Sequence, residues 1–354
     1  GRRPGRGAAD QAAVRAAASE RVLECWVGPY GQYVQPFTAA TEALREFAPD
    51  IVLLSAELRS IAPRVVFEFG SLTVEEVNAE RHRILEHLLD WAKLASEATA
   101  AMVLICNFPR PQYPAFGLAD GKRDASETAF YLRLNLELLE ALRSIDRINV
   151  LDLDAAVAAY GGDRAWARRM YYLAKQPWHP GMCAYLARDV WRHVIAAKGW
   201  ARKCLVVDLD NTLWGGVVGE DGPVNLRVGA GDPTGEAYAD FQRAVRGLKY
   251  RGVILAVASK NNPEDVDAAF GQRPEMPLRK EDFAIMEVGW HTKVESLQSI
   301  AATLDIGLNS LVFLDDNPAE RAMVRGALPD VLVPEMPDDP AQYASFLKRQ
   351  GIFQ

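Results

Sequence analysis

Short apolar runs alternate with longer amphipathic stretches along the first half of the chain. Each run is too short for a typical helix and borders turn-forming residues, as at Pro49-Asp50, so the runs predict buried strands. The longer stretches repeat apolar side chains at the spacing of one helix face, which is typical of amphipathic helices. We therefore predict strands at 51–55, 102–106 and 148–153, helices at 75–98, 127–143 and 183–197, and a loop at 107–119. The alternation indicates a parallel sheet that helices cover on both faces.

The same alternation resumes after Gly199-Trp200, where an apolar strand runs straight into Asp210. We predict strands at 202–209, 253–258 and 310–314, and helices at 238–252, 264–270, 293–304 and 319–327. The fold class is thus α/β, with two consecutive α/β domains at 11–199 and 200–354. Residues 1–10 (GRRPGRGAAD) have no apolar core of the kind a signal peptide carries, so we predict a linker or a cloning remnant there.

Composition narrows the class of protein. The 354 residues are 49% hydrophobic and 25% charged, which is ordinary for soluble globular proteins, and no apolar run approaches the ~20 residues of a membrane span. Lys and Arg number 40 against 47 Asp and Glu, and this net charge of −7 argues against a nucleic-acid binder. The cysteines form no CxxC pair, so we expect a cytoplasmic protein with reduced thiols and no zinc site. They are Cys25, Cys106, Cys183 and Cys204.

Two carboxylates directly follow the strand that opens the second domain. Asp208 and Asp210 lie two residues apart in the run DLDNT, at the carboxyl end of that strand. In open α/β sheets ligands bind outside this edge. Such a pair can share one Mg²⁺ and still divide its work, with one carboxylate as nucleophile and the other as general acid and base.

Three further strand ends or helix starts carry matching residues. Ser259 and Asn261 follow a strand and can hold phosphate oxygens, and Lys293 opens a helix where it can neutralise a phosphoryl group. Asp315 and Asp316 end another strand and offer hard oxygen ligands for a cation. The order of these groups along the chain favours phosphoryl transfer over a chance arrangement of structural residues.

This order resembles the haloacid-dehalogenase-like (HAD) phosphotransferase superfamily. The resemblance implies that Asp208 forms an aspartyl-phosphate and that Asp210 protonates the leaving group and then activates water. It implies further that Thr212 positions the loop and that Ser259 and Lys293 bind the phosphoryl group. Magnesium would be held by Asp208, by the backbone carbonyl of Asp210, and by Asp315 with Asp316 in support.

A narrower resemblance, to the FkbH-like family, rests on four stretches spread over the second domain. They are LDNTLWGGVVGEDG (209–222), ASKNNPEDV (258–266), FLDDNPAER (313–321) and DVLVPEMPDDPAQY (330–343). This family implies removal of both phosphates from 1,3-bisphosphoglycerate and loading of the glyceryl unit onto the phosphopantetheine thiol of an acyl carrier protein in polyketide assembly. The segment between Gly215 and Asp221 is short, so any cap over the site is minimal and a carrier-borne arm could enter.

The first domain resembles the flavodoxin-like SGNH-hydrolase fold in degenerate form. Asn107 follows a strand and His179 lies in PWHPGM, but no GDS block is present and Gln176 stands where that family carries an aspartate. We therefore expect a scaffold or carrier-docking module without hydrolase activity, in which Asn107 and His179 are relics, substrate contacts or ordinary loop residues.

The family's acyl transfer implies a thiol acceptor. Cys204 is the candidate enzyme thiol because it belongs to KCLVVDLDNT, yet four residues of strand place it ~13 Å from Asp208. A buried cysteine among apolar residues is normally inert, so direct transfer to the carrier thiol stays open.

Further residues near the motifs could have a role in binding. Trp214 and Trp290 could wall the pocket, and His291 could touch substrate or lie in an exposed loop. The basic run at Arg164, Arg168 and Arg169 could meet an acidic carrier protein or form a solvated helix face.

Two alternative functions stay open at this stage. One is a HAD phosphatase of a free small metabolite, which would need no carrier protein. The other is a silent carrier-recruitment domain, although such a domain has no need for a complete set of charged residues.

Overall fold

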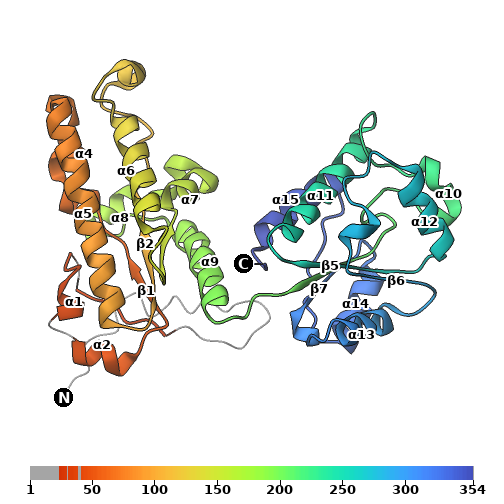
Figure 1. The fold of residues 1–354 in the computed structure, drawn as a ribbon. Coiled ribbons are helices and arrows are strands. Elements are labelled where there is room, and N and C mark those ends of the chain that lie inside the picture. The colour runs from red at the N-terminus through yellow and green to blue at the C-terminus, as the bar shows by residue number, and fades with distance from the viewer. Residues whose placement is uncertain (1–23, 30, 39–40, 354) are drawn as a thin grey trace. The chain divides into compact units, whose positions relative to one another are not determined.

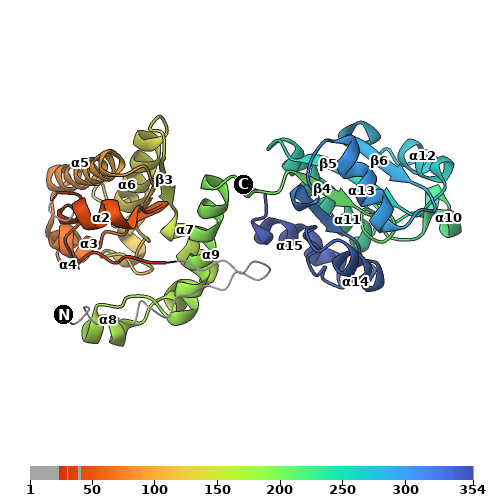
Figure 2. The same ribbon diagram turned by 90° about the horizontal axis from the view of Figure 1, so that it is seen from below.

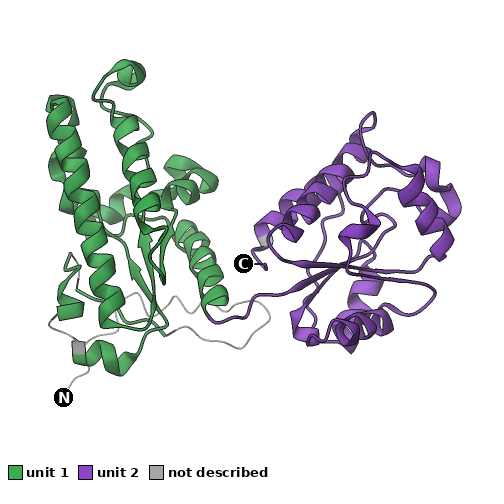
Figure 3. Ribbon diagram, in the orientation of Figure 1, with its two compact units in different colours: residues 1–197 green, residues 198–354 purple. Residues whose placement is uncertain are grey.

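The computed structural model describes residues 24–29, 31–38 and 41–353, and the linker predicted at 1–10 lies outside them. The chain divides into two compact units, residues 1–197 and 198–354 (Figure 3). Each unit has its own parallel sheet, so the predicted α/β class is confirmed. Among the described helices, none combines the length and the apolar character needed to cross a bilayer.

Unit 1 is built on a three-stranded parallel sheet in the order β1-β2-β3. The strands are β1 (Ile51–Leu54), β2 (Met102–Cys106) and β3 (Ile148–Leu151). Side chains of β2 alternate between two cores. Val103 and Ile105 pack with α5 (Val74–Ala98) and α6 (Glu127–Leu142), whereas Cys106 packs with α9 (Pro180–Ala197). Helices therefore cover both faces of this sheet, as the sequence pattern predicts (Figure 1).

Shorter helices complete unit 1. They are α1 (Gln35–Thr38), α2 (Thr41–Phe47), α3 (Leu58–Ile61), α4 (Pro63–Phe67), α7 (Leu153–Tyr160) and α8 (Arg168–Ala174). The predicted strand at 148–153 stops at Leu151 because Asp152 caps α7, its side chain accepting a hydrogen bond from the Ala155 backbone N–H.

Unit 2 holds a four-stranded parallel sheet in the order β6-β5-β4-β7. The strands are β4 (Cys204–Val207), β5 (Ile254–Ser259), β6 (Ile285–Val288) and β7 (Leu311–Leu314). Every residue of β4 and of β7 is buried. Because β4 pairs with β5 on one side and with β7 on the other, the residues that follow these three strands meet at one edge of the sheet.

Helices cover both faces of this second sheet. Figure 1 shows α11 (Pro233–Lys249) and α15 (Tyr343–Gln350) on one face and α13 (Lys293–Thr303) and α14 (Pro318–Ala327) on the other, and Figure 2 looks onto the α13 and α14 side. The chain between β4 and α11 contains only one short α-helix, α10 (Val218–Asp221), and α12 (Pro263–Gln272) follows β5. The edge that carries Asp208 is therefore not covered by an inserted domain from this connection.

Candidate active site

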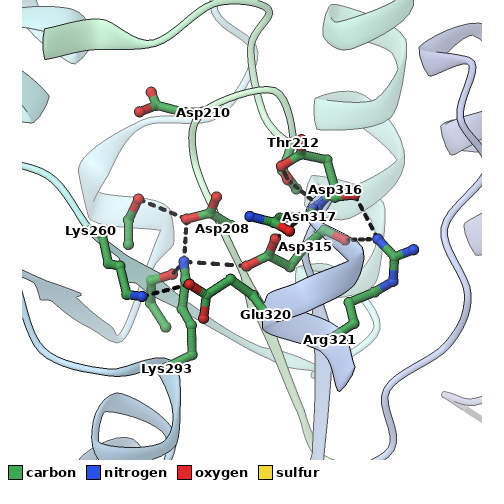
Figure 4. A network of polar contacts seen from close by, with 12 residues as sticks. Asp208, Asp210, Thr212, Lys260, Lys293, Asp315, Asp316, Asn317, Glu320 and Arg321 are labelled. Carbon is green, nitrogen blue, oxygen red and sulfur yellow. Dashed lines mark hydrogen bonds and ion pairs between the residues drawn. The ribbon is translucent and has the colours of Figure 1, made fainter. Parts of the chain in front are cut away.

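Asp208 follows the central strand β4 and lies at the centre of a polar cluster (Figure 4). Its backbone N–H donates to the carbonyl oxygen of Leu314, which continues the β4–β7 pairing to this residue. Oδ1 of Asp208 accepts hydrogen bonds from the Ser259 hydroxyl at 2.8 Å and from Nζ of Lys293 at 2.5 Å. The structure thus brings together three of the predicted site residues, which are far apart in the sequence.

The chain turns sharply after Asp210, at Asn211. This residue has a φ of 52°, in the left-handed region that asparagine tolerates better than most residues. The Asn211 side chain accepts a hydrogen bond from the Gly216 backbone N–H at 3.0 Å. The turn therefore has a fixed shape, and the side chains of Asp208 and Asp210 point to different sides of it (Figure 4).

Asp210 is held by donors of its own. Oδ1 accepts from the Trp214 indole N–H at 2.9 Å and from the Val218 backbone N–H at 3.1 Å, and Oδ2 accepts from the Asn261 amide at 3.0 Å. Burial raises the pKa of the Asp210 carboxyl, and these hydrogen bonds only partly oppose the effect. A raised pKa suits a carboxyl group that has to deliver a proton.

Lys293 is the first residue of α13, and its place depends on the helix cap. Thr292 and Glu295 form a capping box that begins the helix at this residue. The Lys293 side chain is 4% exposed, and Nζ contacts Oδ1 of Asp208, the Ala258 carbonyl oxygen at 2.6 Å and Oδ2 of Asp315 at 3.4 Å. Burial alone would lower the pKa of Lys293, but the charges of Asp208 and Asp315 raise it.

Three carboxylates meet beside this lysine. One ligand oxygen from each of Asp208, Asp315 and Asp316 lies within 4.8 Å of the others. Burial, and then the negative charge of Asp208, raises the pKa of both the Asp315 and the Asp316 carboxyl groups. Oδ2 of Asp315 is buried, and its one polar contact among the described residues is the ion pair with Nζ of Lys293 at 3.4 Å, which is too long and poorly aligned for a hydrogen bond. A largely buried set of hard oxygen atoms, one of which has only a long ion-pair contact, fits a small divalent cation such as Mg²⁺.

Backbone contacts fix the turn that carries Asp315 and Asp316. The buried Thr212 hydroxyl accepts from the Asp316 backbone N–H at 3.1 Å and lies 3.4 Å from Oδ1 of Asp316. Arg321 donates to the carbonyl oxygens of Asp315 and Asp316 at 2.8 and 2.7 Å. Thr212 therefore lies where it can position the loop, and Arg321 is a positioning residue that the sequence reasoning missed. Its place in FLDDNPAER was the available signal.

The remaining predicted residues of unit 2 lie in different surroundings. Asn261 contacts Asp210 and, at 3.1 Å, the Ser259 hydroxyl oxygen. Trp214 is fully buried, packs edge-on against Phe270, and donates its indole N–H to Asp210. Trp290 is 74% exposed, with its indole N–H bonded to the Asn262 side chain.

Cys204 begins the strand that Asp208 follows, at the opposite end of β4. It is buried, and burial raises the pKa of its thiol to about 12. His291 is exposed, two residues before Lys293. In the described part of the chain, neither Cys204 nor His291 forms a hydrogen bond with the three-carboxylate cluster.

The predicted residues of unit 1 have local partners. Asn107 donates to Oδ1 of Asp152 at 2.8 Å and accepts from the Asp154 backbone N–H, which ties the end of β2 to the start of α7. Nδ1 of His179 accepts from the Gly181 backbone N–H and lies 3.3 Å from the Tyr160 hydroxyl oxygen.

Gln176, which stands where SGNH hydrolases carry the aspartate of their triad, also has a local partner. Gln176 donates to Sγ of Cys183 at 3.5 Å.

The basic run of unit 1 lies at the surface. Its residues Arg164, Arg168 and Arg169 are exposed, and Arg168 pairs with Asp163.

Comparison with solved structures gives an informative match. No protein-family model matches the chain, and no curated protein does. The chain is similar to the N-terminal part of the protein BF1531 from Bacteroides fragilis, which contains a phosphatase domain and was solved with Mg. The identity is 32%, the TM-score is 0.81, and the match covers 94% of this chain and 86% of that one.

Two further solved structures match weakly. One is 3-deoxy-D-manno-octulosonate 8-phosphate phosphatase from Moraxella catarrhalis, at 16% identity, a TM-score of 0.28, and coverage of 44% of this chain and 90% of that one. The other is MnaA from S. aureus with UDP, at 9% identity, a TM-score of 0.22, and coverage of 93% and 72%. Scores this low do not establish a common fold.

The match to BF1531 spans both units, and the site described above lies wholly within unit 2. The chain therefore belongs to the same family as the phosphatase-containing N-terminal part of BF1531, and its second unit has the HAD phosphatase fold.

Proposed function

We propose that the chain is a Mg²⁺-dependent phosphatase that works through an aspartyl-phosphate and passes a glyceryl unit from 1,3-bisphosphoglycerate to the phosphopantetheine thiol of an acyl carrier protein. The observation that carries the phosphatase part is the arrangement around Asp208. Its carboxylate contacts the Ser259 hydroxyl and the Lys293 ammonium and lies beside the carboxylates of Asp315 and Asp316. This combination of nucleophile, cation and hard oxygen ligands is what transfer of a phosphoryl group to a carboxylate requires.

The first chemical step joins Asp208 to phosphorus. An oxygen of the Asp208 carboxylate attacks, the bond from phosphorus to the substrate oxygen breaks, and Asp210 gives its proton to that leaving oxygen. Lys293 and Ser259 hold the phosphoryl oxygens. In the second step Asp210 takes a proton from water, the water oxygen attacks phosphorus, and inorganic phosphate leaves Asp208 free.

The cation has a defined place in this scheme. Asp208, Asp315 and Asp316 would hold Mg²⁺, together with the backbone carbonyl of Asp210. When bound, it supplies the positive charge that lets a phosphate dianion approach a carboxylate. The relative from Bacteroides fragilis was solved with Mg, which supports this choice of ion.

Transfer to a carrier protein is a separate step, in which the thiol sulfur bonds to the C1 carbonyl carbon of 1,3-bisphosphoglycerate, the bond from C1 to the 1-phosphate oxygen breaks, and the thiol proton leaves with the phosphate. The hydrolytic steps above then remove the 3-phosphate alone. This transfer rests on the resemblance of the motifs in unit 2 to the FkbH-like family. The exposed arginines at 164, 168 and 169 offer positive charge to an acidic carrier protein. The connection between β4 and α11 is short and inserts no domain over the edge of the sheet that carries the site. A long phosphopantetheine arm would need this open edge to reach Asp208.

Simple hydrolysis is the second candidate function. It is favoured by the position of Cys204, which is the cysteine of unit 2 and is buried at the far end of β4. An enzyme without a thiol at its site can still load a carrier directly, or it can release the dephosphorylated acid. A silent recruitment role fits less well, because the charged set around Asp208 is complete.

One experiment separates these functions. The chain is incubated with Mg²⁺, 1,3-bisphosphoglycerate and holo carrier protein, and both released phosphate and the intact mass of the carrier are measured. A glyceryl mass on the carrier supports transfer. Phosphate release with an unmodified carrier supports simple hydrolysis, and neither product supports recruitment alone. A chain with Asp208→Asn is the control for contaminating phosphatase.

A further inference from the structure

A second lysine lies at the rim of the site, directly after a site residue. Lys260 follows Ser259, whose hydroxyl contacts Asp208, and its Nζ pairs with Oε1 of Glu320 at 2.5 Å. Glu320 belongs to the first turn of α14, which begins just after Asp315 and Asp316. Figure 4 draws this pair beside the Lys293 and Asp208 pair.

Lys260 and Lys293 differ in how their donors are used. Lys293 is 4% exposed and has three acceptors around Nζ. The Lys260 side chain is 35% exposed, and among the described residues its one hydrogen-bond partner is Glu320. An ammonium group has three N–H donors, so Lys260 can keep its bond to Glu320 and still donate to a ligand that enters from solvent.

Glu320 holds this lysine and limits where it can reach. The Glu320 side chain is 14% exposed, and its Oε2 is buried without a hydrogen-bond donor in the described part of the chain. A carboxylate so placed depends on Lys260 for its charge compensation, because an unpaired buried charge is costly. The lysine is thereby kept at the rim and does not swing freely as a surface lysine does.

We infer that Lys260 forms an anion subsite that binds a second anionic group of the substrate, while Lys293 and Ser259 hold the phosphoryl group that is removed. This inference rests on the proposed function and deepens it, because it names the residue that would bind the second anionic group of such a substrate, a phosphate as in 1,3-bisphosphoglycerate or a carboxylate. A hydrogen bond from a charged donor is worth ~1.5–3 kcal/mol, which at 1.36 kcal/mol per factor of ten corresponds to a preference of about 10- to 150-fold.

The test uses three compounds of similar length that differ in the second group. Glycerol 3-phosphate has none, 3-phosphoglycerate has a carboxylate, and glycerol 1,3-bisphosphate has a phosphate. The wild-type chain should prefer both compounds that carry a second anionic group to glycerol 3-phosphate in kcat/KM. Lys260→Met should lower this preference at least tenfold, mainly through KM, and Lys260→Arg should keep most of it. The compound with the larger preference identifies the kind of anion.

A matched control exists in the same unit. Lys249 pairs with Asp282 at 2.7 Å, and these side chains are 39% and 17% exposed, close to the values for Lys260 and Glu320. Lys249 ends α11, before the amino end of β5, whereas Lys260 follows the carboxyl end of that strand. Lys249→Met should therefore lower the melting temperature about as much as Lys260→Met and leave the substrate preference unchanged.

The inference is wrong if Lys260→Met weakens the reaction of all three compounds equally, since the pair would then be only a structural tie. A folded Glu320→Gln variant gives an independent reading, because it keeps the acceptor oxygen and removes the competing charge. It should bind 3-phosphoglycerate several-fold more tightly relative to glycerol 3-phosphate. An unchanged or smaller ratio would contradict the subsite.

If the proposed function is wrong, the experiment gives a result that differs from failure of the subsite. If the wild-type chain with Mg²⁺ hydrolyses none of the three compounds, phosphatase activity on this class is excluded. Titration calorimetry of the same compounds, now free of turnover, still decides whether Lys260 contributes to their binding.

Discussion

The indole N–H of Trp214 donates to Oδ1 of Asp210 at 2.9 Å, from a position four residues further along the chain. The backbone N–H of Val218 reaches the same oxygen, and the Asn261 amide reaches the other. Both carboxylate oxygens of Asp210 are therefore engaged on the side away from Lys293. The Asp210 side chain is therefore held apart from the three-carboxylate cluster of Asp208, Asp315 and Asp316.

Asp210→Asn should make the rate depend strongly on the leaving group. The amide cannot donate an acidic proton, so a substrate with a poor leaving group, such as an alkyl phosphate, should lose at least a hundredfold in rate. p-Nitrophenyl phosphate, which has a good leaving group, should lose much less in the formation of the aspartyl-phosphate. Pre-steady-state release of nitrophenol measures that step, and an equal loss for both substrates would contradict the acid role.

Asp208→Asn should abolish phosphate release and leave the fold intact. The change keeps the shape of the side chain and removes the nucleophilic charge, which should cost several powers of ten in rate, or ~4 kcal/mol or more of barrier. Phosphate assays report the activity, and circular dichroism reports the fold. More than a few per cent of residual activity would mean that another residue is the nucleophile.

Removal of Mg²⁺ should stop turnover. Three carboxylates and one ammonium group leave an excess of negative charge at the site, which a divalent cation offsets. EDTA should therefore abolish phosphate release, and Mg²⁺ should raise the melting temperature of the wild-type chain but not of Asp315→Ala. Full activity in EDTA, with metal content confirmed as negligible, would remove the cation from the mechanism.

Asp120 should stabilise unit 1 in a pH-dependent way. Its buried carboxylate accepts from the Ser126 hydroxyl at 2.7 Å and from the backbone N–H groups of Glu127 and Thr128, at the start of α6. Burial alone would raise the pKa of Asp120, but hydrogen bonds from Ser126, Thr128 and Glu127 lower it. Asp120→Ala should cost about 2 kcal/mol of unfolding free energy at neutral pH.

The direction of the pH effect follows from the lowered pKa. A carboxyl that is more acidic in the folded chain contributes stability above its ordinary pKa of about 4 and loses it as the pH falls through the folded value. The difference in stability between wild type and Asp120→Ala should therefore shrink below about pH 4. Denaturant titrations at several pH values measure it, and a difference that stays constant would contradict this account.

Cys204→Ala should lose little activity. The thiol is buried at the start of β4, and its raised pKa of about 12 leaves almost no thiolate at neutral pH. The measurement is phosphate release, together with intact mass after incubation with 1,3-bisphosphoglycerate. An acyl mass on the Cys204 peptide that hydroxylamine removes, with a loss beyond a hundredfold in the variant, would show that the acyl group visits this thiol.

The sequence was sufficient to predict the strands and helices that place the site. Strong apolar runs marked β4, β5 and β7, and polar residues at their ends marked the site itself. The strand β6 was missed because it is an edge strand with no fully buried residue and a glutamate at position 287. The helix α15 was missed because the sequence before it was noted for its family-like motif, and its eight residues are too few to give a clear helical spacing of apolar side chains.

Side-chain partners were harder to predict than strands. The sequence placed Asp208, Ser259, Lys293 and Asp315 at one edge, and the structure joins them by direct contacts. It could not show that Trp214 turns inward to Asp210 or that Lys260 pairs with Glu320 across sixty positions of chain, since both depend on the path of loops. The roles of these residues in catalysis stay predictions.

The central position of β4 in its sheet has a consequence for the conditions under which the site loses activity. Asp208 is positioned by a strand whose neighbours on both sides also carry site residues, so its geometry depends on backbone hydrogen bonds that are among the last to open. The amide hydrogens of Val206 and Val207 should exchange with solvent only when unit 2 unfolds as a whole. Under increasing denaturant, catalytic competence should therefore persist up to the cooperative transition of the sheet, and inactivation below that point would originate in the loops or in loss of the cation.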